Sequence, residues 1–216
     1  MSVLIAPSML SANFANLGND VEMVNRSEAD LFHLDIMDGV FVPNISFGFP
    51  VVEAIAKEAT KPLDAHLMII NPEKYIVRFK EAGVSYLSIH LETSIHLHRS
   101  LQAIKAEGMK AGIAINPHTP ISSLEEIITE ADFVLLMSVN PGFSAQKFIE
   151  SSLIKVEKLK NLILQKAPKC LIEVDGGVSL DNAALLTKAG ADILVAGNAV
   201  FGASDPLQAI HKLKNI

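Results

Sequence analysis

The chain has 216 residues, half of them hydrophobic, 19% charged and 6% aromatic, with a formal net charge of -6 at neutral pH. Acidic and basic residues are interspersed, and because no basic stripe occurs we expect no nucleic-acid partner. The start of the chain, MSVLIAPSML, does not resemble a secretion signal, no apolar run approaches the length of a membrane helix, and the single cysteine, Cys170, excludes an internal disulfide, so we expect a cytoplasmic, enzyme-like protein with no membrane partner.

Apolar runs and helix signals alternate along the chain. The first half predicts strands at 3–8, 31–36, 63–68 and 85–90, with helices at 13–28, 51–59, 71–83 and 95–107. The second half predicts strands at 110–115, 133–139, 170–175 and 193–196, with helices at 122–128, 148–165, 180–189 and 205–213. Pro and Gly mark several of the connections, as is typical of turns.

This alternation has a period of about 27 residues, which fits a closed α/β barrel of ordinary size. It predicts a single domain over residues 1–216, folded as a (β/α)8 TIM barrel. An open, doubly wound sheet is the alternative arrangement. The barrel is favoured because candidate functional residues follow strands throughout the chain, whereas an open sheet concentrates its site at one switch point.

The strand in LFHLDIMD carries polar residues on one face only. His33 and Asp35 lie two residues apart and share that face, while the residues between and around them are apolar. For an isolated strand, a solvent-facing polar row is the favoured interpretation. The run LDAHLM repeats the alternation with Asp64 and His66 on one face, and this repetition favours a functional site.

Two imidazoles and two carboxylates follow from this pattern at the ends of three strands. Each residue alone is more often structural, but in a barrel their strands end at the same mouth. Such a set suits one divalent transition metal, Zn, Fe, Mn or Co. The candidate ligands are His33, Asp35, His66 and Asp175.

Glycine-rich loops follow the last three predicted strands, where barrels of this kind frequently bind phosphate through backbone N–H groups. Each glycine alone is more often a plain turn residue. Their joint placement favours a phosphate site. The candidate residues are Gly142, Phe143, Ser144, Ala145, Gly176, Gly177, Gly197 and Asn198.

Six segments resemble, in matching order, the signatures of the ribulose-phosphate 3-epimerase family. They extend from Ala6 to Phe201 and read APSMLSANF, HLDIMDGVFVPNISFG, DAHLMI, MSVNPGF, EVDGGV and VAGNAVF. The resemblance implies a carbohydrate epimerase, an isomerase of the pentose phosphate pathway, that interconverts D-ribulose 5-phosphate and D-xylulose 5-phosphate. It also implies a homo-oligomer whose ligand is a small sugar phosphate.

The family's residue roles can be carried over by position. The resemblance implies that His33, Asp35, His66 and Asp175 hold the metal, and that Asp35 and Asp175 also form the two-base pair. Inversion at C3 then passes through a metal-stabilised enediolate, with one proton removed from one face and one returned to the other. It further implies substrate contacts from Ser8, His66 and a wall formed by Met37, Met68 and Met137.

Three segments depart from the family pattern, at four positions in all. NPGFSAQ stands where the family usually has NPGFGGQ, AGNAVF replaces AGSAVF, and Val40 stands where histidine is often found. Ser144 and Ala145 can serve as backbone donors only if that loop needs no positive φ.

Other functions stay open at this point. D-allulose-6-phosphate 3-epimerase is the nearest alternative, and a metal-dependent phosphate-binding barrel lyase is another. A Schiff-base aldolase is disfavoured because no predicted strand ends in lysine. A barrel that only binds is disfavoured because both Asp35 and Asp175 are present.

Overall fold

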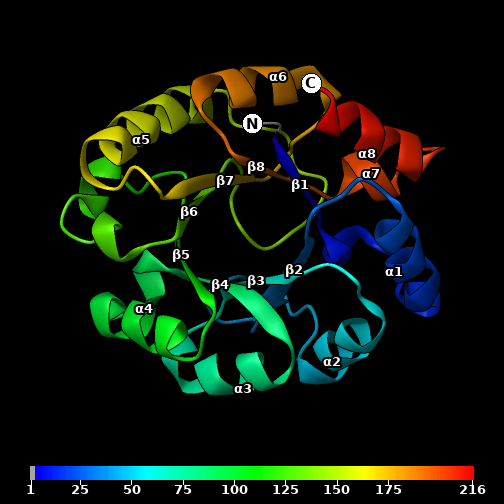
Figure 1. The fold of residues 1–216 in the computed structure, drawn as a ribbon, viewed down its shortest axis with the longest axis horizontal. Coiled ribbons are helices and arrows are strands. Elements are labelled where there is room, and N and C mark those ends of the chain that lie inside the picture. Colours follow the sequence, from blue (N-terminus) through cyan, green and yellow to red (C-terminus); the bar gives the residue numbers. More distant parts are fainter. Residues whose placement is uncertain (1–2) are drawn as a thin grey trace.

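The computed structural model describes residues 3–216 and confirms the barrel. Within that range eight parallel strands follow one another in the order β1-β8-β7-β6-β5-β4-β3-β2. Figure 1 looks into the ring of strands, with the helices arranged around it. The strands are β1 Leu4–Pro7, β2 Phe32–Met37, β3 Leu63–Met68, β4 Val84–His90, β5 Lys110–Ile115, β6 Phe133–Met137, β7 Leu171–Asp175 and β8 Ile193–Ala196.

The helices differ from expectation at several connections. The helices predicted from residues 13 and 71 begin as 3-10 turns, Phe14–Asn16 and Pro72–Tyr75, the short helix Asn198–Phe201 was not predicted, and the largest differences lie after β5 and β6. The α-helices are α1 Leu17–Arg26, α2 Phe49–Glu58, α3 Ile76–Glu81, α4 Leu97–Ala106, α5 Ser152–Lys166, α6 Leu180–Ala189, α7 Asn198–Phe201 and α8 Pro206–Lys214. The helix predicted at 122–128 is wrong, since the described residues between β5 and β6 form only short 3-10 turns, Ile121–Leu124 and Ile128–Glu130. Pro120 and the β-branched Ile127-Ile128-Thr129 run disfavour a regular helix there.

The second large difference concerns the start of α5. The predicted start at 148 is four residues early, because Phe148 to Ser151 belong to the loop above the barrel. Ile149 donates its backbone N–H to the Ser138 carbonyl, which draws this segment back to the end of β6. The amphipathic pattern continues into the loop because Phe148 packs on the main core, although it is not helical.

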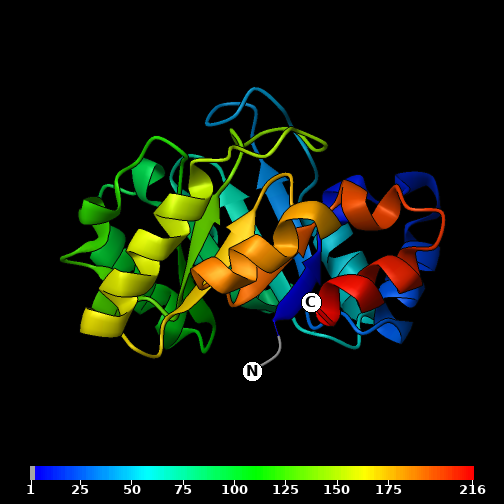
Figure 2. The same cartoon turned by 90° about the horizontal axis from the view of Figure 1, so that it is seen from above.

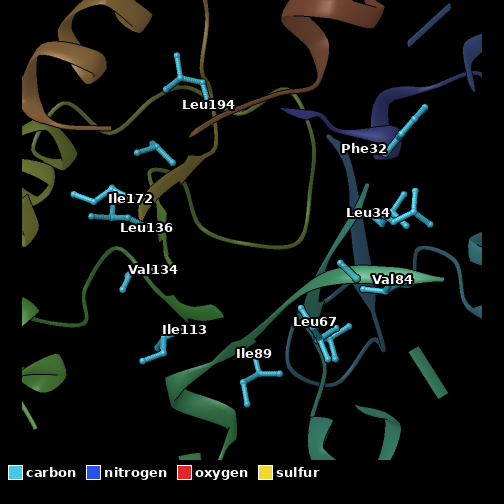
Figure 3. Close-up of a cluster of buried hydrophobic side chains, with 14 of the residues drawn as sticks. Phe32, Leu34, Leu67, Val84, Ile89, Ile113, Val134, Leu136, Ile172 and Leu194 are labelled. Carbon is cyan, nitrogen blue, oxygen red and sulfur yellow. The ribbon is translucent and has the colours of Figure 1, made fainter. Parts of the chain in front are cut away.

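The core lies between the strands and the surrounding helices. Residues that alternate with the polar ones point outward from the barrel, and Figure 3 shows this layer, with Leu34 from β2, Leu67 from β3 and Leu136 from β6 among its members. These side chains are fully buried. The outward apolar layer explains why β2 and β3 alternate between apolar and polar residues although both strands are buried along their whole length.

Aromatic side chains fill the barrel at the end where the strands begin. Tyr86 and Phe133 stack with ring centroids 5.8 Å apart. Gly112 makes room for them, since a Cβ at this position would lie 2.3 Å from the Phe133 ring. The barrel is therefore a packed core at this end, and the site has to lie toward the other.

Aspartates tie neighbouring strands together at their N-terminal ends. Asp30, which precedes β2, accepts the backbone N–H of Ile5 at 2.8 Å. Asp132 before β6 accepts the N–H of Ala111 at 2.9 Å, and Asp192 before β8 that of Ile172, also at 2.9 Å. The repeated Ala-Asp pair before these strands thus links neighbouring strands at the N-terminal end of the barrel.

Candidate metal centre and active site

Four side chains converge at the C-terminal mouth of the barrel. His33 and Asp35 come from β2, His66 from β3 and Asp175 from the end of β7. The parallel register of β2 and β3 places Asp35 directly beside His66. Each of the four residues offers one nitrogen or oxygen atom, and these atoms all lie within 4.8 Å of one another.

The arrangement fits a divalent cation. His33 Nε2 lies 3.4 Å from Asp35 Oδ1, and His66 Nδ1 lies 3.3 Å from the same oxygen and 3.9 Å from Asp175 Oδ2. Among the described residues, His33 Nε2 is buried without a hydrogen-bond partner. A buried ring nitrogen that faces carboxylates and lacks a hydrogen-bond partner can offer its lone pair to a metal ion. Two nitrogens with two carboxylate oxygens suit a transition metal of the zinc type.

The other ring nitrogen of His33 contacts two buried carboxyl groups deeper in the barrel. Its Nδ1 lies 2.6 Å from Asp64 Oδ2 and 3.4 Å from Glu173 Oε1, and all three side chains are fully buried. A carboxylate behind a histidine orients the ring and selects its tautomer, leaving Nε2 free toward the cavity. Burial and the neighbouring Asp64 raise the pKa of Glu173 well above its usual value, which favours the protonated form of this carboxyl group.

The two candidate acid/base carboxyls have opposite electrostatic environments. Burial and the charge of Asp35 raise the pKa of Asp175 to about 7. Burial alone would also raise the pKa of Asp35, but the charge of the adjacent His33 outweighs it and holds this pKa well below its usual value. One carboxyl thus ionises readily while the other retains a proton near neutral pH.

The two histidines are also distinct. Burial lowers the pKa of His66 to about 4, so its ring is neutral at physiological pH and has a free lone pair. Burial also acts to lower the pKa of His33, but Asp35 and Asp64 raise it well above its usual value. The carboxylates thus favour a positive charge at His33, which a cation bound at Nε2 can supply.

A cavity of about 260 Å³ opens above this cluster. Of the predicted substrate-binding and phosphate-binding residues, only His66 does not line it. Ser8 donates its hydroxyl to Asp35 Oδ2 at 2.6 Å. The predicted methionine wall is present, since the cavity is lined by Met37, Met68 and Met137.

The predicted phosphate loops meet at one end of the cavity. Gly176 and Gly177 both adopt positive φ, +115° and +63°. A Cβ at Gly177 would lie 2.7 Å from the Phe148 nitrogen, so only glycine lets the loop after β7 pack against the loop after β6. A Cβ at Gly197 would lie 2.6 Å from the Ser11 hydroxyl. The close approach of these backbones brings the glycine-rich loops together at the wall of the cavity.

The Ser-Ala departure from the family pattern places a residue other than glycine where the backbone has a positive φ. Ala145 has φ +57°, in the left-handed region that glycine adopts without cost. The condition set by the sequence, that the loop needs no positive φ, is therefore not met at this residue. Ser144 and Ala145 nevertheless line the cavity beside Gly142.

Two long loops stand over the mouth. Figure 2 shows the segment after β2 and the segment after β6 projecting on the side opposite the N-terminus. Asn44 in the first loop donates its side-chain amide to the Gly142 carbonyl in the second at 2.9 Å. Asp38 holds the first loop by accepting the backbone N–H groups of Val40, Phe41 and Ile70.

The sequence assigned no role to several polar residues at the site. Asp64 and Glu173 support His33, and His90 on β4 lies 2.9 Å from His66 across their Nε2 atoms. The signal for His90 was the same polar alternation seen in β2 and β3. Ser11 and Ser179 also line the cavity, and a hydroxyl in a loop gives no comparable signal.

Comparison with known proteins relates almost the whole chain to one family. The model of the ribulose-phosphate 3 epimerase family matches residues 4–201. The ribulose-phosphate 3-epimerase of Bacillus subtilis is 50% identical over 213 residues, covering 98% of each chain. That of Aquifex aeolicus is 48% identical over 213 residues, covering 99% of this chain and 96% of the relative. The chloroplastic enzyme of Arabidopsis thaliana is 48% identical and covers 98% of this chain and 76% of its own.

Solved structures of low sequence identity share the fold. A 3-hexulose-6-phosphate synthase aligns over 100% of this chain and 99% of its own, with a TM-score of 0.69 and 20% identity. A mutant tryptophan synthase alpha-subunit from Pyrococcus furiosus aligns over 100% and 98%, with a TM-score of 0.72 and 17% identity. At these identities the likeness concerns the barrel alone. Among the helices of the described chain, none combines the length and the apolar character that a membrane crossing requires.

Proposed function

Because this chain is an epimerase that belongs to the ribulose-phosphate 3-epimerase family, we propose that it interconverts D-ribulose 5-phosphate and D-xylulose 5-phosphate by inverting C3. The observation that carries the proposal is the pair of carboxyls, Asp35 and Asp175, which line one cavity from β2 and β7 and have opposite pKa shifts. Inversion needs one group to take a proton and another to give one. The asymmetric pair supplies both.

Asp35 and Asp175 are the proposed catalytic residues. In the metal-free protein Asp35 is the group that ionises, and Ser8 holds one of its oxygens through a hydrogen bond of 2.6 Å. Asp175, with its pKa raised to about 7, retains a proton for delivery. Because epimerisation runs in both directions, each carboxyl acts as base for one substrate and as acid for the other.

His33, Asp35, His66 and Asp175 would hold one divalent ion, Zn, Fe, Mn or Co. When bound, such an ion supplies Lewis-acid stabilisation of negative charge on the substrate oxygens next to C3, a contribution of several kcal/mol. His33 is oriented for this by Asp64 behind it. The methionines supply an apolar, uncharged wall beside the reacting carbon, which excludes water.

The far end of the cavity would bind the phosphate. Backbone N–H groups of the glycine-rich loops can donate to it, and the described lining of the cavity includes neither lysine nor arginine. The proposed contacts come from Gly142, Phe143, Ser144, Ala145, Gly176, Gly177, Gly197 and Asn198. Neutral donors distinguish a phosphate held in fixed geometry from a nonspecific anion.

Substitution of each carboxyl tests the two-base proposal. We expect Asp35→Asn and Asp175→Asn each to reduce turnover by at least about 100-fold, since general acid or base catalysis typically contributes that much. Turnover and solvent-deuterium incorporation at C3 are measured with pentulose and hexulose phosphates. Asp181→Asn, an exposed carboxylate on α6, is the matched control. Normal turnover in either catalytic variant would refute the two-base mechanism, and a preference for hexulose phosphates would refute the proposed substrate.

Removal of metal tests the centre separately. Exhaustive chelation should abolish activity, and re-addition of a divalent ion should restore it, because the carboxylate and imidazole donors would otherwise leave the enediolate charge unbalanced. Metal content is determined by elemental analysis before and after. Full activity in protein shown to be metal-free would contradict the assignment.

A further inference from the structure

A second histidine lies behind the proposed metal ligand His66. His66 Nε2 and His90 Nε2 are 2.9 Å apart, and the two ring centroids are 5.0 Å apart. His90 Nδ1 in turn lies 3.0 Å from Glu92 Oε2. Both imidazoles are fully buried, and Phe41 packs on His90 with a centroid distance of 4.6 Å. A continuous hydrogen-bonded chain therefore runs from the cavity to Glu92.

Glu92 is fixed at the outer end of this chain. Its Oε1 accepts the backbone N–H of Asn116 at 2.9 Å and a hydrogen bond from the Thr119 hydroxyl. Lys155 secures the same turn, donating to the carbonyl of Asn116 at 2.6 Å. Burial acts to raise the pKa of Glu92, but hydrogen bonds from His90, Thr119 and Asn116 outweigh this and lower it to about 2. At neutral pH the group is a carboxylate that can only accept hydrogen bonds.

The carboxylate at the outer end sets the direction of the hydrogen bonds along the chain, and at His66 the 2.9 Å contact of Nε2 with His90 is shorter than the 3.3 Å contact of Nδ1 with Asp35. His90 must present N–H at Nδ1 to Glu92, so in its neutral form His90 Nε2 has a lone pair. His66 must then present N–H at Nε2 to His90. The remaining nitrogen of a neutral His66, Nδ1, has its lone pair directed toward Asp35 and Asp175. That is the tautomer a cation at the four-residue cluster requires.

We propose that His90 and Glu92 are positioning residues, which hold His66 in the orientation and tautomer that bind the metal through Nδ1. The two histidine ligands are thereby fixed through opposite nitrogens, since Asp64 holds His33 at Nδ1 and leaves its Nε2 free. The inference rests on the proposed metal centre. It adds that the binding geometry is set by a chain extending to the turn after β5, outside the catalytic cavity.

Substitutions at His90 separate positioning from simple packing. His90→Phe keeps an aromatic ring against Phe41 but removes the acceptor for His66 Nε2–H. His90→Gln can place an amide oxygen toward His66 and an amide N–H toward Glu92. Ser88→Ala, at another fully buried polar residue of β4, is the matched control. Folding of each variant is checked by thermal unfolding of the metal-free protein.

The first readout is affinity for Zn²⁺, measured by competition with a chromophoric chelator. Loss of an outer-shell partner typically costs 10- to 100-fold in metal affinity. We expect such a loss in His90→Phe, affinity close to wild type in His90→Gln, and no change in Ser88→Ala. Equal affinity of wild type and a folded His90→Phe variant would overturn the inference.

The second readout is the histidine tautomer, measured by long-range ¹H–¹⁵N correlation in the metal-free wild-type protein and in Glu92→Gln. We expect His66 to be protonated at Nε2 and His90 at Nδ1 in wild type, with mixed tautomers in Glu92→Gln because the carboxylate is lost. Protonation of His66 at Nδ1, or of His90 at both nitrogens, would overturn the inference even if His90→Phe fails to fold.

These outcomes are distinguishable from failure of the proposed function. A wild-type protein that binds no Zn²⁺ would refute the metal centre, and the inference with it. Tight binding of Zn²⁺ by both wild type and His90→Phe would refute only the positioning role. Because Asp35 and Asp175 are also proposed ligands, turnover of the Asp35→Asn and Asp175→Asn variants tests the two-base mechanism when it is compared with their Zn²⁺ affinity, measured in the same way.

Discussion

At the scale of single residues, Ala145 holds the backbone in a conformation that its side chain opposes. It has φ +57° in the loop proposed to hold phosphate. An L-residue in this region costs roughly 1–2 kcal/mol, from which glycine is free. The side chain therefore stores strain beside the cavity.

We expect Ala145→Gly to raise the free energy of unfolding by up to about 1 kcal/mol, because relief of strain exceeds the extra entropy that glycine has in the unfolded chain. Urea denaturation measures the change. Ala59→Gly is the control, since Ala59 has φ −67° and should lose stability. A loss of stability in Ala145→Gly as large as in the control would show that the left-handed conformation carries no strain.

Glu92 links stability to pH at the same scale. Its folded pKa of about 2 lies below the usual 4.5, so its contribution to stability is fully present above pH 4.5 and disappears as the pH falls toward 2. We expect wild type to be more stable than Glu92→Gln at pH 6, with the difference shrinking below pH 4.5. Chemical denaturation between pH 6 and 3.5 measures both proteins. A constant difference across that range would contradict the shift.

At the scale of elements, the strands supply the ligands and the loops supply the walls of the site. β2 contributes two proposed ligands and β3 one, and a strand held on both sides by parallel neighbours positions them firmly. The loop after β2 depends instead on Asp38. Each carboxylate oxygen of Asp38 accepts backbone N–H groups, and these hydrogen bonds lower the pKa of this half-buried carboxyl against the effect of burial.

We expect Asp38→Asn to loosen that loop, because an amide N–H then faces one of the backbone donors. Loss of about 1.4 kcal/mol locally corresponds to about tenfold faster amide exchange. Hydrogen exchange at Val40, Phe41 and Ile70 measures it, and Val52 in α2 serves as the internal reference. Unchanged protection at all three amides would show that Asp38 does not hold the loop.

At the scale of the whole molecule, the junction between β1 and β2 closes the ring of strands with the least strand pairing; we call it the seam. In the described chain these two strands share no extended ladder. They are joined by the parallel bridge between Ser8 and His33 and by backbone hydrogen bonds from Asp30 and Leu31 to the Ile5 carbonyl. Asp30 adds a hydrogen bond to Ile5 and an ion pair of 2.6 Å with Lys214 of the final helix. The C-terminal helix thus fastens the first and second strands.

We expect Asp30→Ala to lower the free energy of unfolding by about 1.5–3 kcal/mol, as for a lost hydrogen bond to a charged group. Asp132→Ala should cost less, because β5 and β6 keep their ladder and the ion pair of Asp132 with Lys110 is longer, 3.7 Å. Urea denaturation compares the two variants. A loss in Asp132→Ala equal to or above that in Asp30→Ala would contradict the importance of the seam.

The sequence by itself predicted the eight strands and the residues of the metal centre. Alternation of apolar and polar residues is a local property, and it identified His33, Asp35 and His66 because buried strands alternate between the helix-facing and interior layers. The glycine-rich strand ends indicated the phosphate loops, and the family resemblance then pointed to the methionine wall. Helix boundaries were less certain, since the pattern around Phe148 reflects packing on the core without a helix.

Tertiary structure alone decided which interior polar residues support the others. Asp64, Glu173 and His90 alternate along their strands just as the ligands do. Glu92 continues the pattern in the 3-10 turn after β4, and nothing local distinguishes these residues from the ligands. Their roles depend on height within the barrel and on which strand lies across from them. Glu173 meets His33 only because closure of the barrel brings together strands that are far apart in the chain.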